Sequence, residues 1–170
     1  MESFIIMSEN SSDHWPFFDV ENKNVLDIGC GIWYTEEMEE TSPIYFGRTA
    51  NLVVGIDGNG GDIERYIDYV GENSKYVFKR MRITTAEQVK ELIEEYSITA
   101  LKCDIEGGEI SLLDLTSEDL KNVTDIAIEF HNNELKDGFL EKIPEWGFDI
   151  KVFANFKRAP LHMGVIYGVK

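Results

Sequence analysis

Residues 25–31 read VLDIGCG, a short apolar run that ends in two glycines separated by one residue. Val25–Ile28 is too short for a helix and consists mainly of aliphatic residues, which is typical of a buried strand. Gly29 and Gly31 let the backbone turn tightly and pass close to a ligand, because glycine has no Cβ. The stretch therefore predicts a first strand followed by a glycine loop, although a tight turn without a ligand would have the same sequence.

The glycine pattern is incomplete for a dinucleotide site. Gly29 and Gly31 are followed by Ile32 and Trp33, where the dinucleotide fingerprint requires a third glycine or small residue. Without that residue, helix and strand cannot approach closely over a pyrophosphate. An NAD-binding, dehydrogenase-like domain is therefore the less favoured alternative.

Six further apolar runs follow, and most are separated by segments with helical spacing. The predicted strands are Leu52–Asp57, Tyr76–Ile83, Thr99–Asp104, Asp125–His131, Phe148–Phe153 and Gly164–Val169. Helices are predicted around residues 63–70, 89–96, 108–113 and 135–142, and the acidic segment 35–40 has only a weak helical pattern. Thr84 and Glu87 match a capping box. The four prolines are expected in loops.

Alternating strands and helices predict an α/β fold with a parallel sheet and right-handed crossovers. The last two predicted strands have no helix between them, so we expect an antiparallel hairpin at one side of the sheet. A doubly wound sheet binds its ligand beyond the carboxyl ends of the strands. Candidate functional residues should therefore lie at strand ends.

Asp57 ends the second predicted strand, twenty-six residues after Gly31. A carboxylate at this place can accept hydrogen bonds from both hydroxyls of a ribose. An aspartate that starts a turn before Gly58 is an equally ordinary explanation. The coincidence with the glycine loop favours a nucleoside site.

Three carboxylates lie within six residues after the fourth predicted strand: Asp104, Glu106 and Glu109. Carboxylates this close repel one another unless a cation or hydrogen bonds compensate. The helix dipole alone would explain Glu109 at the start of a helix. Asp104 and Glu106 are expected to point into the cleft at the strand end, which favours a functional role.

Glu129 and His131 lie at the end of the fifth predicted strand and, with a period of two, face the same way. A glutamate and a histidine in a cleft can act as a base or as metal ligands. A structural histidine is the alternative.

The composition excludes several functions. Thirty-two acidic and sixteen basic residues give a net charge of −16, which disfavours nucleic-acid phosphates and anionic membranes. No apolar run approaches the ~18 residues of a membrane span. Two cysteines are too few for a disulfide scaffold, and the first residues lack the basic region of a secretory signal. We expect one cytoplasmic domain without general nucleic-acid or membrane binding.

In combination, these motifs resemble the class I S-adenosylmethionine-dependent methyltransferases. Within that class, LKCDIEGGEISLL at residues 101–113 resembles the K-x-D-x-E-G-x-E block of the FkbM-type family. The resemblance implies a three-layer Rossmann-like methyltransferase fold, with a mostly parallel seven-stranded sheet and a C-terminal antiparallel hairpin. Residues 25–170 would form the S-adenosylmethionine-binding domain, and residues 1–24 an N-terminal segment that could serve as a partial lid.

The resemblance also implies roles for individual residues. Those near the methionine part of the cofactor would be Asp27, Gly29, Cys30 and Gly31, with Asp104 and Glu106 near its amino group. Asp57 and Gly58 would lie at the ribose, and Ile83 and Thr84 near the adenine. The residues facing the methyl acceptor would be Asp104, Glu129 and His131, as catalytic groups or as ligands of a divalent cation such as Mg²⁺.

The expected acceptor is a hydroxyl of a small molecule or sugar, contacted by aromatic loops within residues 11–18, 33–46 and 153–162. Trp33 in the glycine loop and the weak first helix depart from the family pattern. A catalytically inactive cofactor-binding or interaction module is therefore an alternative. A monomer or a homodimer is expected.

Overall fold

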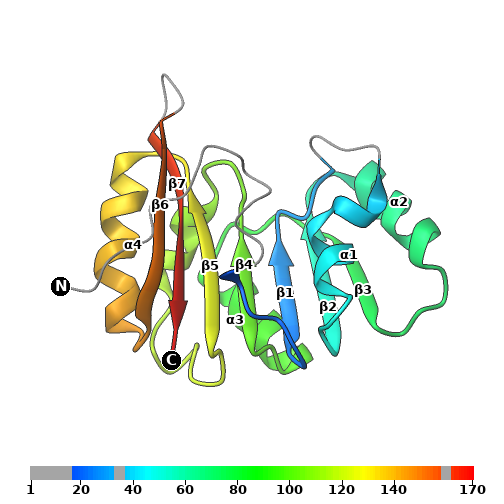
Figure 1. The fold of residues 1–170 in the computed structure, drawn as a ribbon, viewed down its shortest axis with the longest axis horizontal. Coiled ribbons are helices and arrows are strands. Elements are labelled where there is room, and N and C mark those ends of the chain that lie inside the picture. The colour runs from blue at the N-terminus through cyan, green and yellow to red at the C-terminus, as the bar shows by residue number, and fades with distance from the viewer. Residues whose placement is uncertain (1–16, 33–36, 158–161) are drawn as a thin grey trace.

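The computed structural model describes residues 17–32, 37–157 and 162–170, which form a seven-stranded sheet with helices on both faces (Figure 1). The strands are β1 (Asn24–Ile28), β2 (Leu52–Asp57), β3 (Tyr76–Arg80), β4 (Ala100–Cys103), β5 (Asp125–Phe130), β6 (Asp149–Lys157) and β7 (His162–Val169). The α-helices are α1 (Ser42–Phe46), α2 (Gly60–Val70), α3 (Ala86–Tyr96) and α4 (Asn133–Glu145), and the 3₁₀ helices are η2 (Met38–Glu40) and η3 (Glu109–Asp114).

The strand order is β3-β2-β1-β4-β5-β7-β6. Strands β1 to β5 pair in parallel, whereas β7 lies antiparallel between β5 and β6. The expected α/β fold with a parallel sheet and a C-terminal antiparallel hairpin is confirmed. The order reverses between β1 and β4, which makes the carboxyl ends of these strands a topological switch point where ligands bind.

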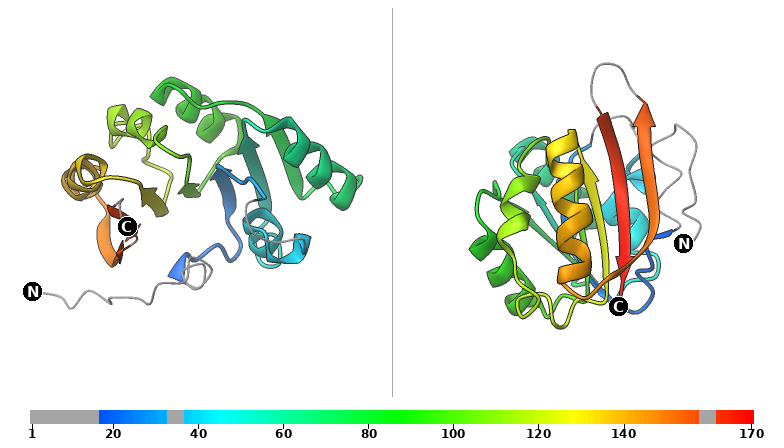
Figure 2. Two further views of the ribbon diagram at one scale, coloured as in Figure 1. Left: turned by 90° about the horizontal axis from the view of Figure 1, so that it is seen from above. Right: turned by 90° about the vertical axis from the view of Figure 1, so that its left-hand side faces the viewer.

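Each face of the sheet has its own core because side chains alternate along the strands. Ile28, Leu101 and Ile128 belong to the larger core, which contains residues of α3, η3 and α4. The opposite face packs against α1, α2 and the segment that contains Phe18 and Val20. Figure 2 shows α3, η3 and α4 on one side of the sheet and α1 on the other. The arrangement is a three-layer sandwich.

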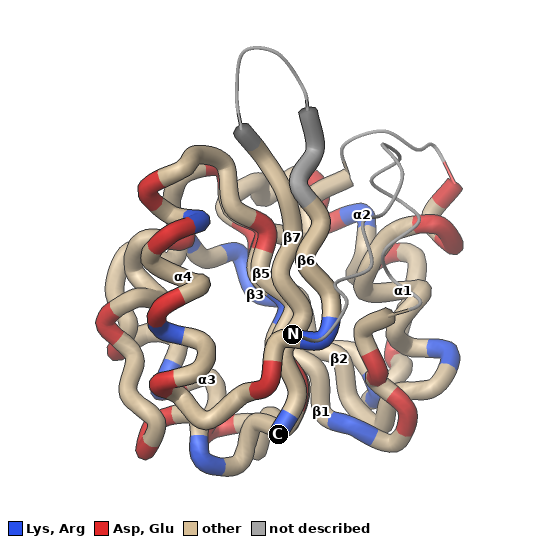
Figure 3. The backbone as a smooth tube through the Cα atoms, turned by 60° about the vertical axis from the view of Figure 1, so that its left-hand side comes forward, with Lys and Arg blue, Asp and Glu red and all other residues tan. Residues whose placement is uncertain are grey.

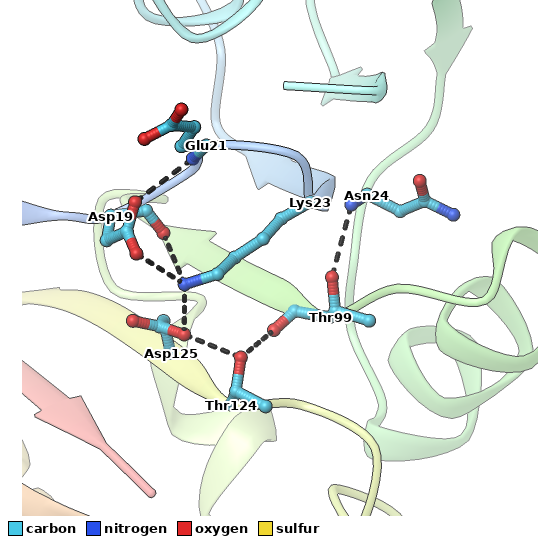
Figure 4. Close-up of polar contacts among 7 residues, drawn as sticks. All are labelled: Asp19, Glu21, Lys23, Asn24, Thr99, Thr124 and Asp125. Atoms are coloured by element: carbon cyan, nitrogen blue, oxygen red, sulfur yellow. Dashed lines mark hydrogen bonds and ion pairs between the residues drawn. The ribbon is translucent and has the colours of Figure 1, made fainter. Parts of the chain in front are cut away.

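A polar network holds the amino-terminal edge of the sheet, opposite the switch point (Figure 4). Lys23 Nζ donates to Asp125 Oδ2 at 2.6 Å and to Asp19 Oδ2 at 3.0 Å. Thr124 Oγ1 donates to the same Asp125 oxygen at 2.6 Å. The Asn24 amide donates to Thr99 Oγ1 at 3.1 Å. These bonds tie the segment before β1 to the starts of β4 and β5.

Several local expectations were wrong. The capping box of α3 uses Thr85 and Gln88 instead of Thr84 and Glu87, because the helix begins one residue later. Pro43 lies in the first turn of α1, where a missing amide costs nothing, and Pro144 lies inside α4 near its end. Strand β3 ends at Arg80, so residues 81–84 form a loop.

The aromatic segments expected near the acceptor lie partly outside the described residues, at positions 11–16, 33–36 and 158–161. Acidic residues occur along η2, α2, α3, α4 and the loops, with basic residues interspersed (Figure 3). The negative charge is thus spread around the molecule. In the described part of the chain, no helix is both long and apolar enough to cross a membrane.

Candidate functional site

A cavity of about 670 Å³ opens at the carboxyl ends of β1, β2 and β4 and at the loop after β3. Its lining residues are Ile28, Gly29, Ile56, Asp57, Gly58, Asn59, Met81, Arg82, Ile83, Thr84, Asp104, Ile105, Glu106, Gly107, Gly108, Ile110 and Ser111. Its volume lies within the range of roughly 300–1,000 Å³ that small-molecule sites occupy. Seven residues that the sequence suggested for cofactor binding line it: Gly29, Asp57, Gly58, Ile83, Thr84, Asp104 and Glu106.

Gly29 forms the turn at the floor of this cavity. Its φ is +78°, and its amide donates to Ile56 O at 2.8 Å. A Cβ at this position would lie 1.7 Å from the carbonyl oxygen of Asp104. Only glycine permits both the left-handed conformation and this close approach of two strand ends.

A buried ion pair supports the glycine turn from below. Asp27 and Lys102 lie opposite each other in the parallel register of β1 and β4, with Lys102 Nζ 3.0 Å from Asp27 Oδ1. The same ammonium donates to Gly29 O at 2.9 Å. Burial alone would lower the pKa of Lys102, but the charges of Asp27 and Asp104 raise it above its usual value. Lys102 is therefore protonated, and its side chain links β4 to the turn at Gly29.

Asp57 ends β2 and accepts a hydrogen bond from the Asn59 amide at 2.7 Å. Asn59 in turn caps α2 by accepting from the Gly61 amide. Asp57 therefore starts a turn and also lines the cavity, so a structural role in the turn and a role in ligand binding are compatible. On the neighbouring loop, Ile83 is buried, and Thr84 donates to Gln88 Oε1 through its amide at 2.8 Å.

A second, smaller hollow lies beside the cavity and is about 10 Å³ in volume, roughly one water molecule. Its lining residues are Phe18, Phe46, Lys102, Cys103, Asp104, Ala127, Glu129, Val165 and Tyr167. Asp104 lines both spaces.

His131 lies among three carboxylates, those of Asp104, Glu109 and Glu129. Its Nδ1 is 2.5 Å from Glu109 Oε1, and its Nε2 is 3.7 Å from Asp104 Oδ1. Glu129 Oε1 is 3.9 Å from the same Nε2. The structure thus brings together the three residues expected at the acceptor and adds Glu109.

The acidic surroundings shift the pKa values of this group. Burial lowers the pKa of His131, but the close Glu109 carboxylate, with Asp104 and Glu129, outweighs burial and raises the pKa to about 9. Burial and the charge of Asp104 raise the pKa of Glu129 to about 8, against the opposing effects of His131 and Lys102. The surroundings therefore favour the protonated forms of both Glu129 and His131.

Three of the suggested residues do not line the cavity. Asp27 is fully buried beneath it, and Cys30 is buried with Tyr66, whose hydroxyl donates to the Cys30 carbonyl at 2.7 Å. Burial raises the pKa of the Cys30 thiol, which makes this side chain unreactive. Gly31 follows in the same loop.

Two residues near the site were missed as contributors. Lys102 and Glu109 are both in the K-x-D-x-E-G-x-E block, which was the signal available for them. Glu109 lies in the first turn of η3, as the helix-dipole explanation expected, and it is also fully buried against His131.

The sequence matches no protein-family model and no curated protein. Solved structures do resemble it. Aeropyrum pernix fibrillarin with bound S-adenosylmethionine has a TM-score of 0.57 at 12% identity, over 88% of this chain and 67% of that one. Magnesium protoporphyrin IX methyltransferase from Synechocystis, also with bound S-adenosylmethionine, has 0.57 at 12% identity, over 89% and 72%. The chain has a Rossmann-like α/β fold that it shares with these methyltransferases.

A protein of the NADB-Rossmann superfamily from Streptococcus agalactiae is similar as well, with a TM-score of 0.65 at 12% identity, over 97% of this chain and 70% of that one. Identities this low establish a shared fold alone. Function has to be argued from the site.

Proposed function

We propose that the chain is an S-adenosylmethionine-dependent methyltransferase of the FkbM type that methylates a hydroxyl of a small molecule or sugar. The observation that carries the proposal is the single cavity in which Gly29, Asp57 and Asp104 meet, although they are far apart in the sequence. When bound, S-adenosylmethionine supplies a methyl group on a positively charged sulfur. Transfer replaces the carbon–sulfur bond by a carbon–oxygen bond, and the electron pair stays on sulfur.

Different residues of the chain would contact different parts of the cofactor along the cavity. Asp57 accepts hydrogen bonds from the ribose hydroxyls, and Ile83 and Thr84 enclose the adenine. Gly29 lets the backbone approach the methionine part, and Asp104 attracts its amino group and the sulfonium. The main contribution to rate is alignment of acceptor, methyl and sulfur.

The acceptor would approach the methyl group from the side of Asp104, with Glu129 and His131 beside it. The hydroxyl proton would leave toward Asp104, because the pKa values of Glu129 and His131 are both raised. The net charge of −16 disfavours an RNA acceptor.

Calorimetry in the presence of EDTA tests cofactor binding. We expect heat with S-adenosylmethionine and S-adenosylhomocysteine and none with NAD. Asp57→Asn should weaken both by about 10- to 100-fold, since a hydrogen bond to a charged group contributes about 1.5–3 kcal/mol. Asp68→Asn, an exposed substitution on α2 with the same loss of charge, should change nothing. Absence of heat with both compounds would refute the proposal.

Turnover is tested separately with a radiolabelled methyl donor and panels of sugars, small phenols and peptides. We expect label on hydroxyl acceptors and a large loss of rate in Asp104→Asn. Cofactor binding without transfer to any acceptor would instead identify a catalytically inactive binding module.

A further inference from the structure

Two side chains of α2 hold the loop that follows Gly29. Tyr66, which is fully buried, donates through its hydroxyl to Cys30 O at 2.7 Å. Asp62, which is half-buried in the first turn of the helix, accepts from the Ile32 amide through Oδ2 at 3.2 Å. The segment from Gly29 to Ile32 is therefore tied to α2 as well as to the strand ends.

The same oxygen of Asp62 receives a second hydrogen bond from a different segment. Asn59 Nδ2 donates to Asp62 Oδ2 at 3.0 Å. The backbone amide of Asn59 donates to Asp57 Oδ1 at 2.7 Å, so Asn59 also holds the carboxylate at the end of β2. One carboxylate oxygen can accept two hydrogen bonds, because it has two lone pairs. Asp62 thus connects the turn at Asp57 to the glycine loop through a single atom.

We propose that Asp62 is a positioning residue of the cofactor site and fixes the loop from Gly29 to Ile32 relative to Asp57. The proposal rests on the proposed function, in which Asp57 binds the ribose and the loop lies beside the methionine part of the same molecule. One ligand can contact both only if their separation is fixed. Asp62 does not itself line the cavity, so it would act through these two segments and not by contact with the ligand.

The helix dipole alone would also favour an acidic residue here, because α2 begins at Gly60 and Asp62 lies in its first turn. That explanation needs a negative charge but no particular contact, so it does not account for the two hydrogen bonds to separate segments. Without an acceptor, the half-buried Ile32 amide would lose its partner, and the loop would move to hydrate it. A neutral acceptor could therefore replace Asp62 in the positioning role but not in the interaction with the dipole.

Asp62→Asn and Asp62→Ala separate the two explanations, because both remove the charge and only asparagine keeps an acceptor oxygen. Calorimetry in EDTA would use S-adenosylhomocysteine and 5′-methylthioadenosine, which has the nucleoside but no amino-acid part. We expect Asp62→Ala to weaken S-adenosylhomocysteine about 5- to 10-fold, the effect of one hydrogen bond, and 5′-methylthioadenosine less than about twofold. Asp62→Asn should leave both affinities within about twofold of those of the unsubstituted protein.

Hydrogen exchange followed by nuclear magnetic resonance, without any ligand, tests the contact itself. The Ile32 amide should exchange slowly in the unsubstituted protein and in Asp62→Asn, and at least about fivefold faster in Asp62→Ala. Asp68→Ala, the same substitution at an exposed position of α2, is the control and should change neither exchange nor binding.

Three results would overturn the proposal. Equal effects of Asp62→Asn and Asp62→Ala on binding would leave only the charge, and equal weakening of the two ligands would mean a general loss of structure. Fast exchange of the Ile32 amide in the unsubstituted protein would mean that Asp62 does not hold the loop, whether or not a variant folds. Absence of heat with both ligands in the unsubstituted protein would instead refute the proposed function, and the exchange of Ile32 would still report on Asp62 separately.

Discussion

Lys102→Met should lower the free energy of unfolding by about 3–5 kcal/mol, the usual cost of removing one partner from a buried ion pair. Lys102 and Asp27 are both buried and lie opposite each other on β4 and β1. Without the ammonium, the Asp27 carboxylate would be left charged at the centre of the sheet. The Gly29 carbonyl would also lose its donor. Urea denaturation followed by circular dichroism measures the change.

Two further variants test whether the lost stability comes from breaking the buried Asp27–Lys102 ion pair or from removing any lysine. Lys90→Met removes a lysine from half-exposed ion pairs with Glu87 and Asp119 and should cost less than about 1 kcal/mol. Combining Lys102→Met with Asp27→Leu should recover most of the lost stability, because an apolar pair replaces both charges. If Lys102→Met is as mild as Lys90→Met, the ion pair is not a structural support.

Most of the fold could be predicted because it depends on local patterns. β2 was predicted at its observed bounds, and the other strands except β3 and β6 were predicted to within two residues at each end. β3 was predicted three residues too long, because Met81 and Ile83 continue the alternation as buried or half-buried loop residues. β6 was predicted four residues too short at its carboxyl end, where it pairs with β7.

The site was predictable in outline for a topological reason. Parallel strands bring their carboxyl ends to one edge, so Gly29, Asp57 and Asp104 had to approach one another once the strands were identified. Glu109 could not be placed in this way. Its burial depends on the turn through Gly107 and on η3, which return the chain toward β5, and no sequence periodicity encodes that path.

The left-handed turn at Gly29 makes Gly29→Ala the most informative substitution in the cavity. Alanine at φ +78° costs about 1–2 kcal/mol, and the new Cβ would overlap the Asp104 carbonyl 1.7 Å away, which adds roughly 1–3 kcal/mol. We expect a combined loss of unfolding free energy of about 2–5 kcal/mol. Binding of S-adenosylhomocysteine should weaken more than 10-fold, since the β1 and β4 ends must separate.

Gly71→Ala measures the loss of unfolding free energy that comes from alanine at a positive φ without a steric clash. Gly71 also has a positive φ, +59°, but a Cβ there would meet nothing within 4 Å. It should cost about 1–2 kcal/mol and leave cofactor binding unchanged, because Gly71 ends α2 outside the cavity. Urea denaturation and calorimetry on both variants make the comparison. If the two alanines have equal effects on stability and on binding, the close approach of Gly29 to Asp104 does not shape the site.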